Sequence, residues 1–517
     1  MAASARVAPV AAATLGVREV AVIDLGSNTA RLDVFEVTEG GALRTVFESK
    51  EVPRLGEGVG QGHRLSREAM ERGIATLRRF ARELEVWGRP AVVAIATSAI
   101  REAENGREFL AQVKAATGLE VNVVSGAEEG RYAYLGTAAA WPLHNDLIVD
   151  VGGGSVQVVA TRRGRFDRAW SAPLGVLSMT ERFLGHDPPR RKEIDELRQH
   201  LRNEFRDLPK SPGASRRRLF GIGGTLRCLA RVAILLTDYP VPQVHGYPLG
   251  ARELRAIGSI LFEMPAERRK DVPGISGHRA DVIPAGVVVA EELLRAAQVE
   301  SLIVSGNGIR QGVAIEAARI SVPAPAEVLA RRSGLAAARR FGFSVVHAED
   351  VRATALRLFD RLKSRYGWSD DDRLAVSVGG WMHDAGTAIE EWRHPFHSAY
   401  ILRHTTVHGV GHREILMAAL AAYLHEGDPA PDGWRKRWKA VLSSEEVERA
   451  MKFGVVLAAA EELAGLDARF GAGASGRIRV RMHHPAGPAA RARAIDRLAR
   501  RLKNGLGVEV ETARGRQ

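Results

Sequence analysis

Apolar residues in the first part of the chain follow two patterns that alternate. Short β-branched runs predict strands, for example at 42–52 and 91–100, whereas apolar residues three and four positions apart predict amphipathic helices at 65–88 and 107–118. Ser66 stands where the N-cap of the helix at 65–88 is expected. Alternating strands and helices are typical of proteins in which helices cover the faces of a sheet. The pattern therefore predicts an α/β fold for this part of the chain.

An apolar strand followed by a glycine-containing turn occurs four times. In the first two copies Asp24 and Asp150 occupy the same position, and we interpret this match as a faint internal repeat that marks two similar half-domains. Glycine turns can aim backbone N–H groups at a phosphate, and a helix that follows adds partial positive charge. We therefore predict that the turns share one phosphate-binding cleft. The four segments are AVIDLGSN (21–28), LIVDVGGG (147–154), LFGIGG (219–224) and LIVSGNG (302–308).

The same patterns divide the chain into predicted domains. A Pro- and Ala-rich stretch at 322–333 is interpreted as a linker, because it interrupts the alternation. Beyond it helical patterns dominate and one late strand is expected at 477–485, so this region is predicted to be all-α or mostly α. The Ala-rich start of the chain is broken by Pro9 and is interpreted as a disordered tail rather than a signal peptide. The predicted parts are a tail at 1–17, a first lobe at 18–138, a second lobe at 139–320 and a helical region at 325–517.

Composition narrows the class of protein. With 45% hydrophobic and 26% charged residues, the 517-residue chain has enough apolar residues for folded cores, which excludes a disordered protein and a coiled coil. The formal net charge of +13 favours a polyanionic partner, although an Arg-rich composition can also have a genomic origin. Cys228 is the single cysteine, which excludes an internal disulfide and a cysteine-based zinc site. No stretch of 18 uncharged apolar residues occurs, so we expect a cytoplasmic protein without a membrane partner.

Acidic residues at strand ends and at one helix start are the first candidates for catalysis. Asp24 and Asp150 each end a strand before a glycine turn, where carboxylates can hold a hydrated Mg²⁺ against phosphate oxygens or can simply cap the turn. Glu128 and Glu129 begin a predicted helix, where a carboxylate either stabilises the helix dipole or activates the water that attacks phosphorus. Arg101 could bind a phosphate with two hydrogen bonds or lie free on the surface. The residues alone leave each of these alternatives open.

Six segments, taken together and in order, resemble the motifs of the exopolyphosphatase/guanosine pentaphosphate phosphatase (Ppx/GppA) family over about residues 18–318. The resemblance implies a duplicated ribonuclease-H-like core of two lobes, the fold shared by actin, sugar kinases and chaperone ATPases, with a phosphate cleft between the lobes. It also implies phosphoanhydride hydrolysis with Mg²⁺ or another divalent cation as cofactor. The segments are VIDLGSNTARLDVFEV, IATSAIRE, VVSGAEEGRYAYLG, LIVDVGGGSVQVV, FGIGGT and LIVSGNGIRQGV.

The resemblance also implies roles for individual residues. Glu129 matches the family's catalytic base, and Asp150 matches an aspartate that positions water or Mg²⁺; with Asp24 they form the expected metal ligands. One departure lies in the GGGSVQ segment, where Val156 and Gln157 stand in place of the family's Thr and Glu. An amide lacks the charge of that carboxylate, so weaker metal binding is expected and, to a lesser degree, weaker activity. The residues that match phosphate contacts are Ser27, Asn28, Arg101, Gly152, Gly153, Gly154, Ser155, Gly223, Gly224 and Thr225.

The C-terminal region resembles the HD-phosphohydrolase-like helical domain that long exopolyphosphatases add. His347, the pair His383-Asp384 and the run HSAY at 397–400 lie where that pattern is expected, but a final Asp ligand is not located. A structural domain without metal and a second metal site both remain open. In long family members this region extends the basic groove that holds the polymer and contributes to a homodimer, so the resemblance implies both here.

The expected function is hydrolysis of the terminal phosphate of inorganic polyphosphate, with Mg²⁺ and with water activated by Glu129. The long C-terminal region favours this polymer over guanosine pentaphosphate, whose trimming in the same site is the nearest alternative. A catalytically weakened phosphate or nucleotide sensor is a further alternative, motivated by Gln157. A kinase of the same fold is disfavoured, because no adenosine pocket is recognised and Glu129 suits attack by water. No specific nucleic-acid partner is expected.

Overall fold

The computed structural model of this protein contains two compact units. One unit contains the chain up to Ala233 together with Pro248–Pro323, and the other contains Ile234–Tyr247 together with the chain from Ala324 onwards. The segment Ile234–Tyr247, which the sequence pattern places in the second lobe, thus belongs to the helical unit. The residues that the structure describes are 19–38, 41–88, 90–209, 218–427, 432–473, 477–482 and 488–512.

The first unit contains a five-stranded sheet, sheet A. Its strand order is β3 (Leu43–Glu51), β2 (Ala30–Val37), β1 (Glu19–Leu25), β4 (Ala91–Ala96) and β5 (Val121–Val123). The strand β2 pairs antiparallel with both β1 and β3, whereas β4 pairs parallel with both β1 and β5. Consecutive residues of β1 are buried, as expected for a strand with helices on both faces of the sheet.

The second sheet of this unit, sheet B, repeats the same arrangement. Its strand order is β10 (Pro248–Gly250), β11 (Ser301–Val304), β9 (Leu219–Ile222), β6 (Leu147–Val151), β7 (Val156–Arg162) and β8 (Arg165–Ala172). The strands β6, β7 and β8 are antiparallel, and β6, β9 and β11 are parallel, so they correspond to β1 to β5 of sheet A. Only β10 lacks a counterpart in sheet A. The repeated topology confirms the duplicated two-lobe α/β core.

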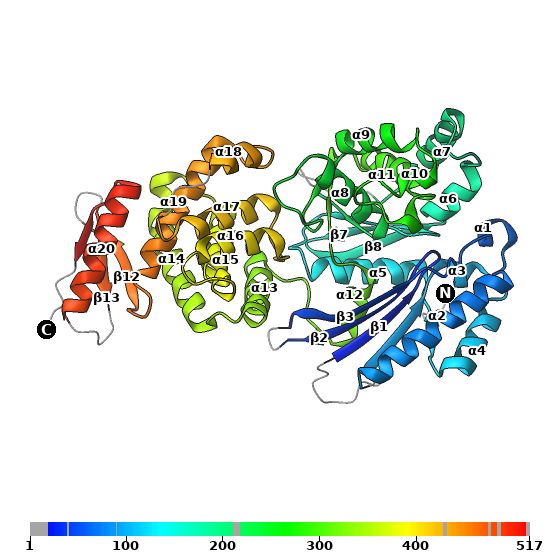
Figure 1. Ribbon diagram of the computed structural model, residues 1–517, viewed down its shortest axis with the longest axis horizontal. Helices are drawn as coiled ribbons and strands as arrows, with labels where there is room; N and C mark the ends of the chain where they lie inside the picture. The colour runs from blue at the N-terminus through cyan, green and yellow to red at the C-terminus, as the bar shows by residue number, and fades with distance from the viewer. Residues whose placement is uncertain are drawn as a thin grey trace. The chain divides into compact units, whose positions relative to one another are not determined.

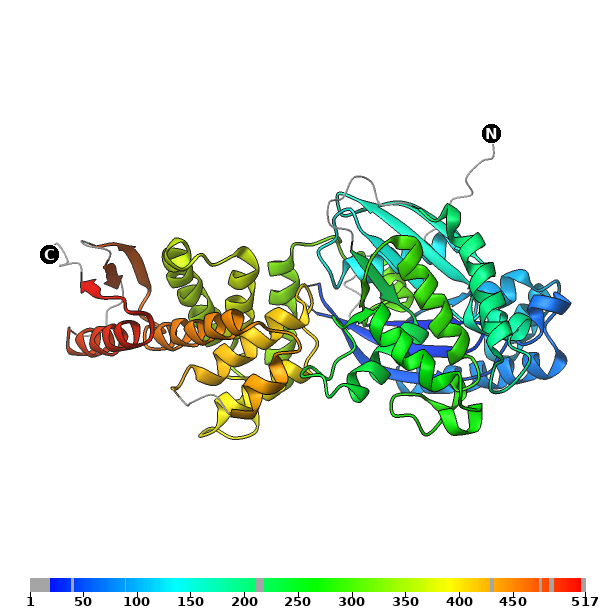
Figure 2. The same ribbon diagram turned by 90° about the horizontal axis from the view of Figure 1, so that it is seen from above.

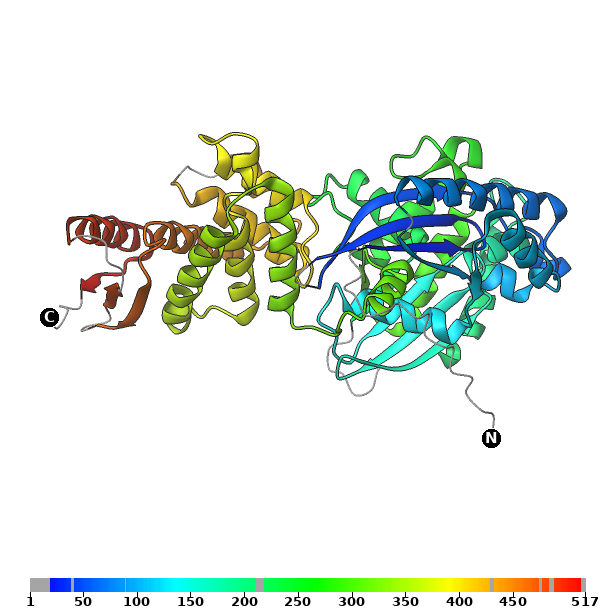
Figure 3. The same cartoon turned by 90° about the horizontal axis from the view of Figure 1, so that it is seen from below.

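Amphipathic helices cover the outer face of sheet A. The helices α2 (Arg67–Val86) and α4 (Gly106–Thr117) pack on it, and the relation of α2 to the strands is visible from two sides (Figures 1 and 3). The helix predicted at 65–88 is confirmed, and Ser66 caps it, because its Oγ accepts a hydrogen bond from the backbone N–H of Ala69 at 3.1 Å. The other helical segments that begin in this unit are α1 (Val59–Gly62), α3 (Ser98–Glu102), α6 (Val176–Phe183), α7 (Arg191–Glu204), η1 (Phe205–Asp207), α8 (Gly224–Leu236), α9 (Ala251–Leu261), α10 (Ala266–Arg269), η2 (Gly277–Arg279) and α11 (Ile283–Ala297).

Two further helices lie between the sheets. These are α5 (Gly126–Ala138) and α12 (Ile309–Ala317) (Figure 1). The helix α5 follows the last strand of sheet A, yet its Tyr134 packs against sheet B. Conversely, α12 follows β11 of sheet B, yet its Val313 packs against sheet A. Each half of the core therefore covers the sheet of the other half with its last helix.

The second unit is mostly helical and has its own apolar core. Contrary to the linker predicted at 322–333, helix α13 already begins at Ala326, because Leu329 and Ala330 are buried. The unit also has a three-stranded sheet, of β12 (Ala468–Ala472), β13 (Ile478–Met482) and β14 (Val510–Thr512), so it is α-dominated rather than all-α (Figure 2). Its helical segments are α13 (Ala326–Phe341), α14 (Val345–Tyr366), α15 (Asp370–Met382), η3 (Ala385–Ala388), α16 (His394–His404), α17 (His412–Leu424), α18 (Asp432–Trp438), α19 (Ser444–Glu461) and α20 (Pro488–Leu506).

Two expectations about the ends and about membranes can be compared with this description. The tail predicted at 1–17 lies outside the described residues. Within the described part of the chain, every helix is too short or too polar to cross a membrane.

Candidate active site

All four glycine turns meet at one cavity in the first unit. The reason is topological, because the carboxyl ends of parallel strands reach the same edge of a sheet. Leu25 of β1 is paired with Ala96 of β4, and Asp150 of β6 is paired with Ile222 of β9. The turns that follow these strands therefore line one space, as the sequence predicts. The residues from the turns that line it are Gly26, Ser27, Asn28, Gly152, Gly153, Ser155, Gly223, Gly224, Thr225 and Gly308.

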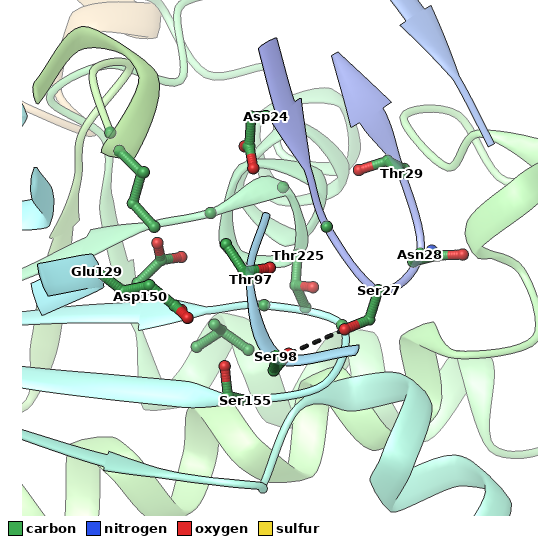
Figure 4. A pocket seen from close by; sticks show the side chains of 18 of the residues that line it. Asp24, Ser27, Asn28, Thr29, Thr97, Ser98, Glu129, Asp150, Ser155 and Thr225 are labelled. Atoms are coloured by element: carbon green, nitrogen blue, oxygen red, sulfur yellow. Dashed lines mark hydrogen bonds between the residues drawn. The ribbon is translucent and has the colours of Figure 1, made fainter. Parts of the chain in front are cut away.

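The first half contributes hydroxyl and amide groups to the cavity. Ser27 Oγ and Ser98 Oγ are 2.9 Å apart and share a hydrogen bond (Figure 4). Thr97 also lines the cavity, although the sequence assigns 91–100 to a strand; the strand β4 ends at Ala96. Both polar atoms of the Asn28 side chain are buried without a hydrogen-bond partner among the described residues. An unpaired buried amide costs free energy, so Asn28 is suited to bind a ligand.

The second half lines the cavity with two glycine turns. Gly223 has φ +95°, and a Cβ there would lie 2.6 Å from Asp150 Oδ1, so only glycine fits beside this aspartate. Thr225 follows in the first turn of α8 and also lines the cavity. Gly154, predicted as a phosphate contact, is not among the lining residues. A Cβ on Gly154 would lie 2.5 Å from Ser27 Oγ, so this glycine lets the two turns pack together.

Glu129 is held in the cavity by one partner from helix α3 and one from strand β7 of sheet B. It lies in the first turn of α5, whose N-cap is Ser125, and only 2% of its surface is exposed. Glu129 Oε1 accepts a hydrogen bond from Arg101, and Glu129 Oε2 accepts one from Gln157 Nε2 at 2.7 Å. Burial raises the pKa of Glu129 to about 7, although the positive charge of Arg101 opposes this shift. A buried carboxylate with a pKa near neutrality can take up a proton at physiological pH.

Arg101 lies beside this carboxylate and does not line the cavity. Its Nη1 donates to Glu129 and also to the carbonyl oxygen of Val124, at 2.7 Å. The predicted phosphate contact thus pairs with Glu129 in this structure. Its side chain is still one quarter exposed, at a neighbouring opening that Ser155 and Ser171 also line.

The two aspartates Asp24 and Asp150 alone are better suited to hold a hydrated divalent cation than the predicted set of three ligands that also includes Glu129. Burial raises the pKa of Asp150 to about 7 and also raises the pKa of Asp24. Among the described residues, oxygens of these aspartates and Glu129 do not form a three-ligand group within 4.8 Å. Mg²⁺ binds proteins through one or two carboxylates while keeping several waters. The two aspartates satisfy that requirement, whereas both oxygens of Glu129 already accept hydrogen bonds.

Four arginines line the same cavity and were not predicted from the sequence. Burial and repulsion from Arg310 lower the pKa of Arg227 to about 9, and burial also lowers the pKa of Arg31 and Arg279. Arg310 pairs with the buried Asp33 of β2. Such a concentration of like charge is stabilised by a bound anion. Three of the arginines occur three residues after a turn residue, namely Arg31 after Asn28, Arg227 after Gly224 and Arg310 after Asn307, which is a signal the sequence does contain.

Two family models match this chain. The one described as the Ppx/GppA phosphatase family matches residues 34–319, and the one described as Ppx/GppA phosphatase, domain III, matches residues 331–437. The first match includes Glu129 and Asp150, whereas the turn at Ser27 precedes it. Exopolyphosphatase 1 of Mycobacterium tuberculosis is 30% identical to this chain over 296 residues, which are 56% of this chain and 86% of the relative. The same values hold for Exopolyphosphatase 1 of Mycobacterium bovis.

Solved structures agree with these matches. The Aquifex aeolicus member of the Ppx/GppA protein family is 32% identical, with a TM-score of 0.50, and the match covers 58% of this chain and 96% of that one. An exopolyphosphatase from Cytophaga hutchinsonii, 23% identical, has a TM-score of 0.53 over 59% of this chain and 100% of its own, which is a likeness of fold.

Proposed function

The chain belongs to the Ppx/GppA phosphatase family, and on this premise we propose that it is an exopolyphosphatase, which removes the terminal phosphate from inorganic polyphosphate. The observation that carries the proposal is the cavity, in which glycine turns and four arginines surround Glu129. Backbone N–H groups and guanidinium groups bind phosphate oxygens, and a polyphosphate offers many of them. A relative named Exopolyphosphatase 1 supports the polymer as the substrate.

Glu129 is the proposed general base. Its carboxylate accepts a proton from water while the water oxygen bonds to the terminal phosphorus. The bond from that phosphorus to the bridging oxygen breaks, and the products are orthophosphate and a polyphosphate shorter by one unit. A pKa near 7 suits a base at neutral pH. Arg101 and Gln157 act through Glu129, because their hydrogen bonds fix the direction of its two oxygens.

The remaining polar groups of the cavity are proposed to bind the substrate. Asn28 supplies an amide without a protein partner, and Gly153 and the turn at 223–225 supply backbone N–H groups, whereas the N–H of Gly152 already donates to the carbonyl oxygen of Ser155. The four arginines balance the negative charge of the polymer end. A divalent cation such as Mg²⁺, held by Asp24 and Asp150, would supply charge neutralisation at the phosphate oxygens.

The test measures release of orthophosphate by the purified full chain with Mg²⁺. Long-chain polyphosphate, guanosine pentaphosphate and ATP are offered separately, and the polymer is expected to be the best substrate. Glu129→Gln keeps the shape of the side chain and is expected to lower turnover about 10²- to 10⁴-fold. The matched control is Glu128→Gln on the same helix, whose carboxylate accepts from the backbone N–H of Ser125 at 2.8 Å and lies outside the cavity.

Each outcome separates the proposals. Preference for guanosine pentaphosphate would show that the substrate is the nucleotide and not the polymer, and the proposal that Glu129 is the base would be unaffected. Full turnover by Glu129→Gln would exclude Glu129 as the base. Absence of turnover with all three substrates, together with tight binding of one of them, would favour a sensor over an enzyme.

A further inference from the structure

Six side chains of the second unit converge on one point, far in sequence from the cavity described above. They come from helices α14, α16 and α19 and from the residues that directly follow α15 and α17. Three of the histidines are buried, whereas the side chains at the edge of the group are partly exposed. We call this group the histidine–carboxylate cluster; it consists of His347, His383, Asp384, His394, His425 and Glu461.

The cluster differs from the ligand pattern expected from the sequence. His347 and the pair His383-Asp384 belong to it, but the run at 397–400 does not. His397 Nε2 instead lies 3.5 Å from Glu390 Oε2. His394, which lies about one helical turn before His397 on α16, is the histidine of this helix that belongs to the cluster. Glu461 supplies a carboxylate where the sequence offered no final aspartate.

Hydrogen bonds fix which nitrogen of each buried histidine faces the cluster. The Nδ1 atoms of His383, His394 and His425 lie 3.0, 2.8 and 2.6 Å from backbone carbonyl oxygens three residues earlier in the chain. A carbonyl oxygen only accepts, so each Nδ1 must carry the hydrogen and donate it. In the neutral ring the lone pair is then on Nε2. Metal-binding histidines are typically oriented by such a bond from the other ring nitrogen.

The lone pairs of two histidines point at each other. His394 Nε2 and His425 Nε2 are 3.3 Å apart, and neither can donate a hydrogen bond while its Nδ1 carries the hydrogen of the neutral ring. Facing lone pairs repel each other, and a shared proton or a metal ion near both atoms would relieve this repulsion. Two ligands that are each 2.0–2.1 Å from a tetrahedral metal ion are about 3.3 Å apart, which matches the observed separation.

The carboxylate oxygens of Asp384 and Glu461 lie at similar distances from the histidine Nε2 atoms. Asp384 Oδ1 lies 3.4 Å from His383 Nε2 and 3.5 Å from His394 Nε2, and Asp384 Oδ2 lies 3.3 Å from His347 Nε2. Glu461 Oε2 lies 3.1 Å from His383 Nε2. Asp384 thus belongs to two groups of possible ligands, one with His347 and His383 and the other with His394 and His425.

We propose that the histidine–carboxylate cluster is a centre for two transition-metal ions, with Asp384 as the ligand that they share. His347, His383 and Glu461 complete one position, and His394 and His425 complete the other. Imidazole and carboxylate donors suit Zn²⁺, Fe²⁺ or Mn²⁺ rather than an ion that binds oxygen alone. Because His347 and Glu461 are 31% and 39% exposed at their side chains, the centre keeps a side open to solvent, where water or a phosphate oxygen can bind.

The test measures metal content and does not depend on polyphosphate turnover. The full chain is stripped with a chelator, loaded separately with Zn²⁺, Mn²⁺ or Fe²⁺, desalted and analysed by elemental mass spectrometry. We expect the wild type to retain about two more ions of one of these metals per chain than Asp384→Asn retains, so that an ion held at Asp24 and Asp150 does not enter the count. Loading with Co²⁺ adds a visible absorption spectrum that reports the coordination geometry of the bound ion.

Variants assign the ions to the cluster. Asp384→Asn, a partly exposed position, is expected to lose both ions, and Glu461→Gln to weaken one position about tenfold or more. His425→Gln is expected to lose the other ion, and His397→Gln is the matched control that retains both. Thermal unfolding of each variant verifies its fold. Retention of no transition metal by the wild type would overturn the proposal and leave a proton shared by His394 and His425. Binding of one ion would overturn the shared-ligand arrangement, and unchanged binding in Asp384→Asn would place the metal elsewhere.

Discussion

Gln157 Nε2 donates a hydrogen bond of 2.7 Å to Glu129 Oε2, from strand β7 of sheet B to the first turn of α5. The same nitrogen lies 2.7 Å from Ser155 Oγ. A glutamate at 157 would put a second carboxylate against Glu129, and two neighbouring carboxylates cannot both ionise easily. The amide therefore orients the proposed base without adding a negative charge to it.

Replacement Gln157→Glu should raise the pKa of Glu129 further. We expect the acid limb of the rate profile to move about one to two pH units higher, because a like charge disfavours ionisation. The activity at high pH should also depend more strongly on the divalent cation, which offsets the added charge. The measurement is orthophosphate release against pH at several Mg²⁺ concentrations. Gln199→Glu, on the exposed face of α7, is the control, and an identical profile for both variants would contradict the prediction.

The pKa of Glu129 also predicts the pH dependence of the wild type. The base must be ionised to accept a proton, so log kcat/KM should rise with a slope near one below about pH 7 and level off above it. Arg101→Gln removes the charge that holds this pKa down, so its limb should lie at higher pH. Because titration of the substrate is the same for both proteins, the difference between the two profiles belongs to the enzyme. Coincident profiles would exclude Glu129 as the titrating group.

Gly175 precedes helix α6 and packs on the turn at 152–154. A Cβ there would lie 2.4 Å from backbone atoms of Gly153, which cannot move aside as a flexible side chain does. We expect Gly175→Ala to lower the free energy of unfolding by about 1–3 kcal/mol and to raise KM for polyphosphate, since the turn must shift. Urea unfolding and steady-state kinetics measure the two effects. Gly60→Ala, in the open space of α1, is the control and should change neither.

Asp150 should make the protein less stable as the pH rises. Its folded pKa, near 7, lies above the ordinary value of 3.8, so the folded state holds a proton that the unfolded state has released between these values. Stability from this group is present below about pH 4 and is lost as the pH rises through 7. Asp150→Asn should therefore raise the thermal midpoint at pH 8 without metal, and the gain should vanish at pH 4. An equal gain at both pH values would point to packing instead of ionisation.

The fold and half of the candidate site follow from local sequence patterns. Asp24, Asp150 and the glycine turns are predictable because a strand end and its glycines lie within ten residues of sequence, and parallel pairing then brings the turns together. For the catalytic base, the sequence offers two candidates at a helix start, Glu128 and Glu129. Arg279 is not predictable from the local sequence, because it lies in a short 3-10 segment without a strand–glycine motif and reaches the cavity only through tertiary packing. The high number of arginines in the chain hides such a residue in the sequence.

In the second unit, even fewer of the clustered residues can be predicted from the local sequence. His383 and Asp384 could be identified as a pair, whereas the choice between His394 and His397 depends on which side of α16 is buried. The helix has a weak apolar pattern, so the sequence does not decide it. Glu461 lies 78 positions from His383, and His425 lies 31 positions from His394, so only the packing of the helices brings these pairs together.

Because α5 and α12 each cover the sheet of the other half, the two halves of the core should depend on each other when they are produced as separate fragments. A fragment that stops after residue 138 would leave Val20 and Phe35 without Val313, and would carry a helix whose own apolar side has no sheet to cover. Neither this fragment nor the remainder of the chain should fold when it is produced alone. When both fragments are produced in one cell, they should associate and form the core. The two halves of a split reporter, one fused to each fragment, would then give a signal.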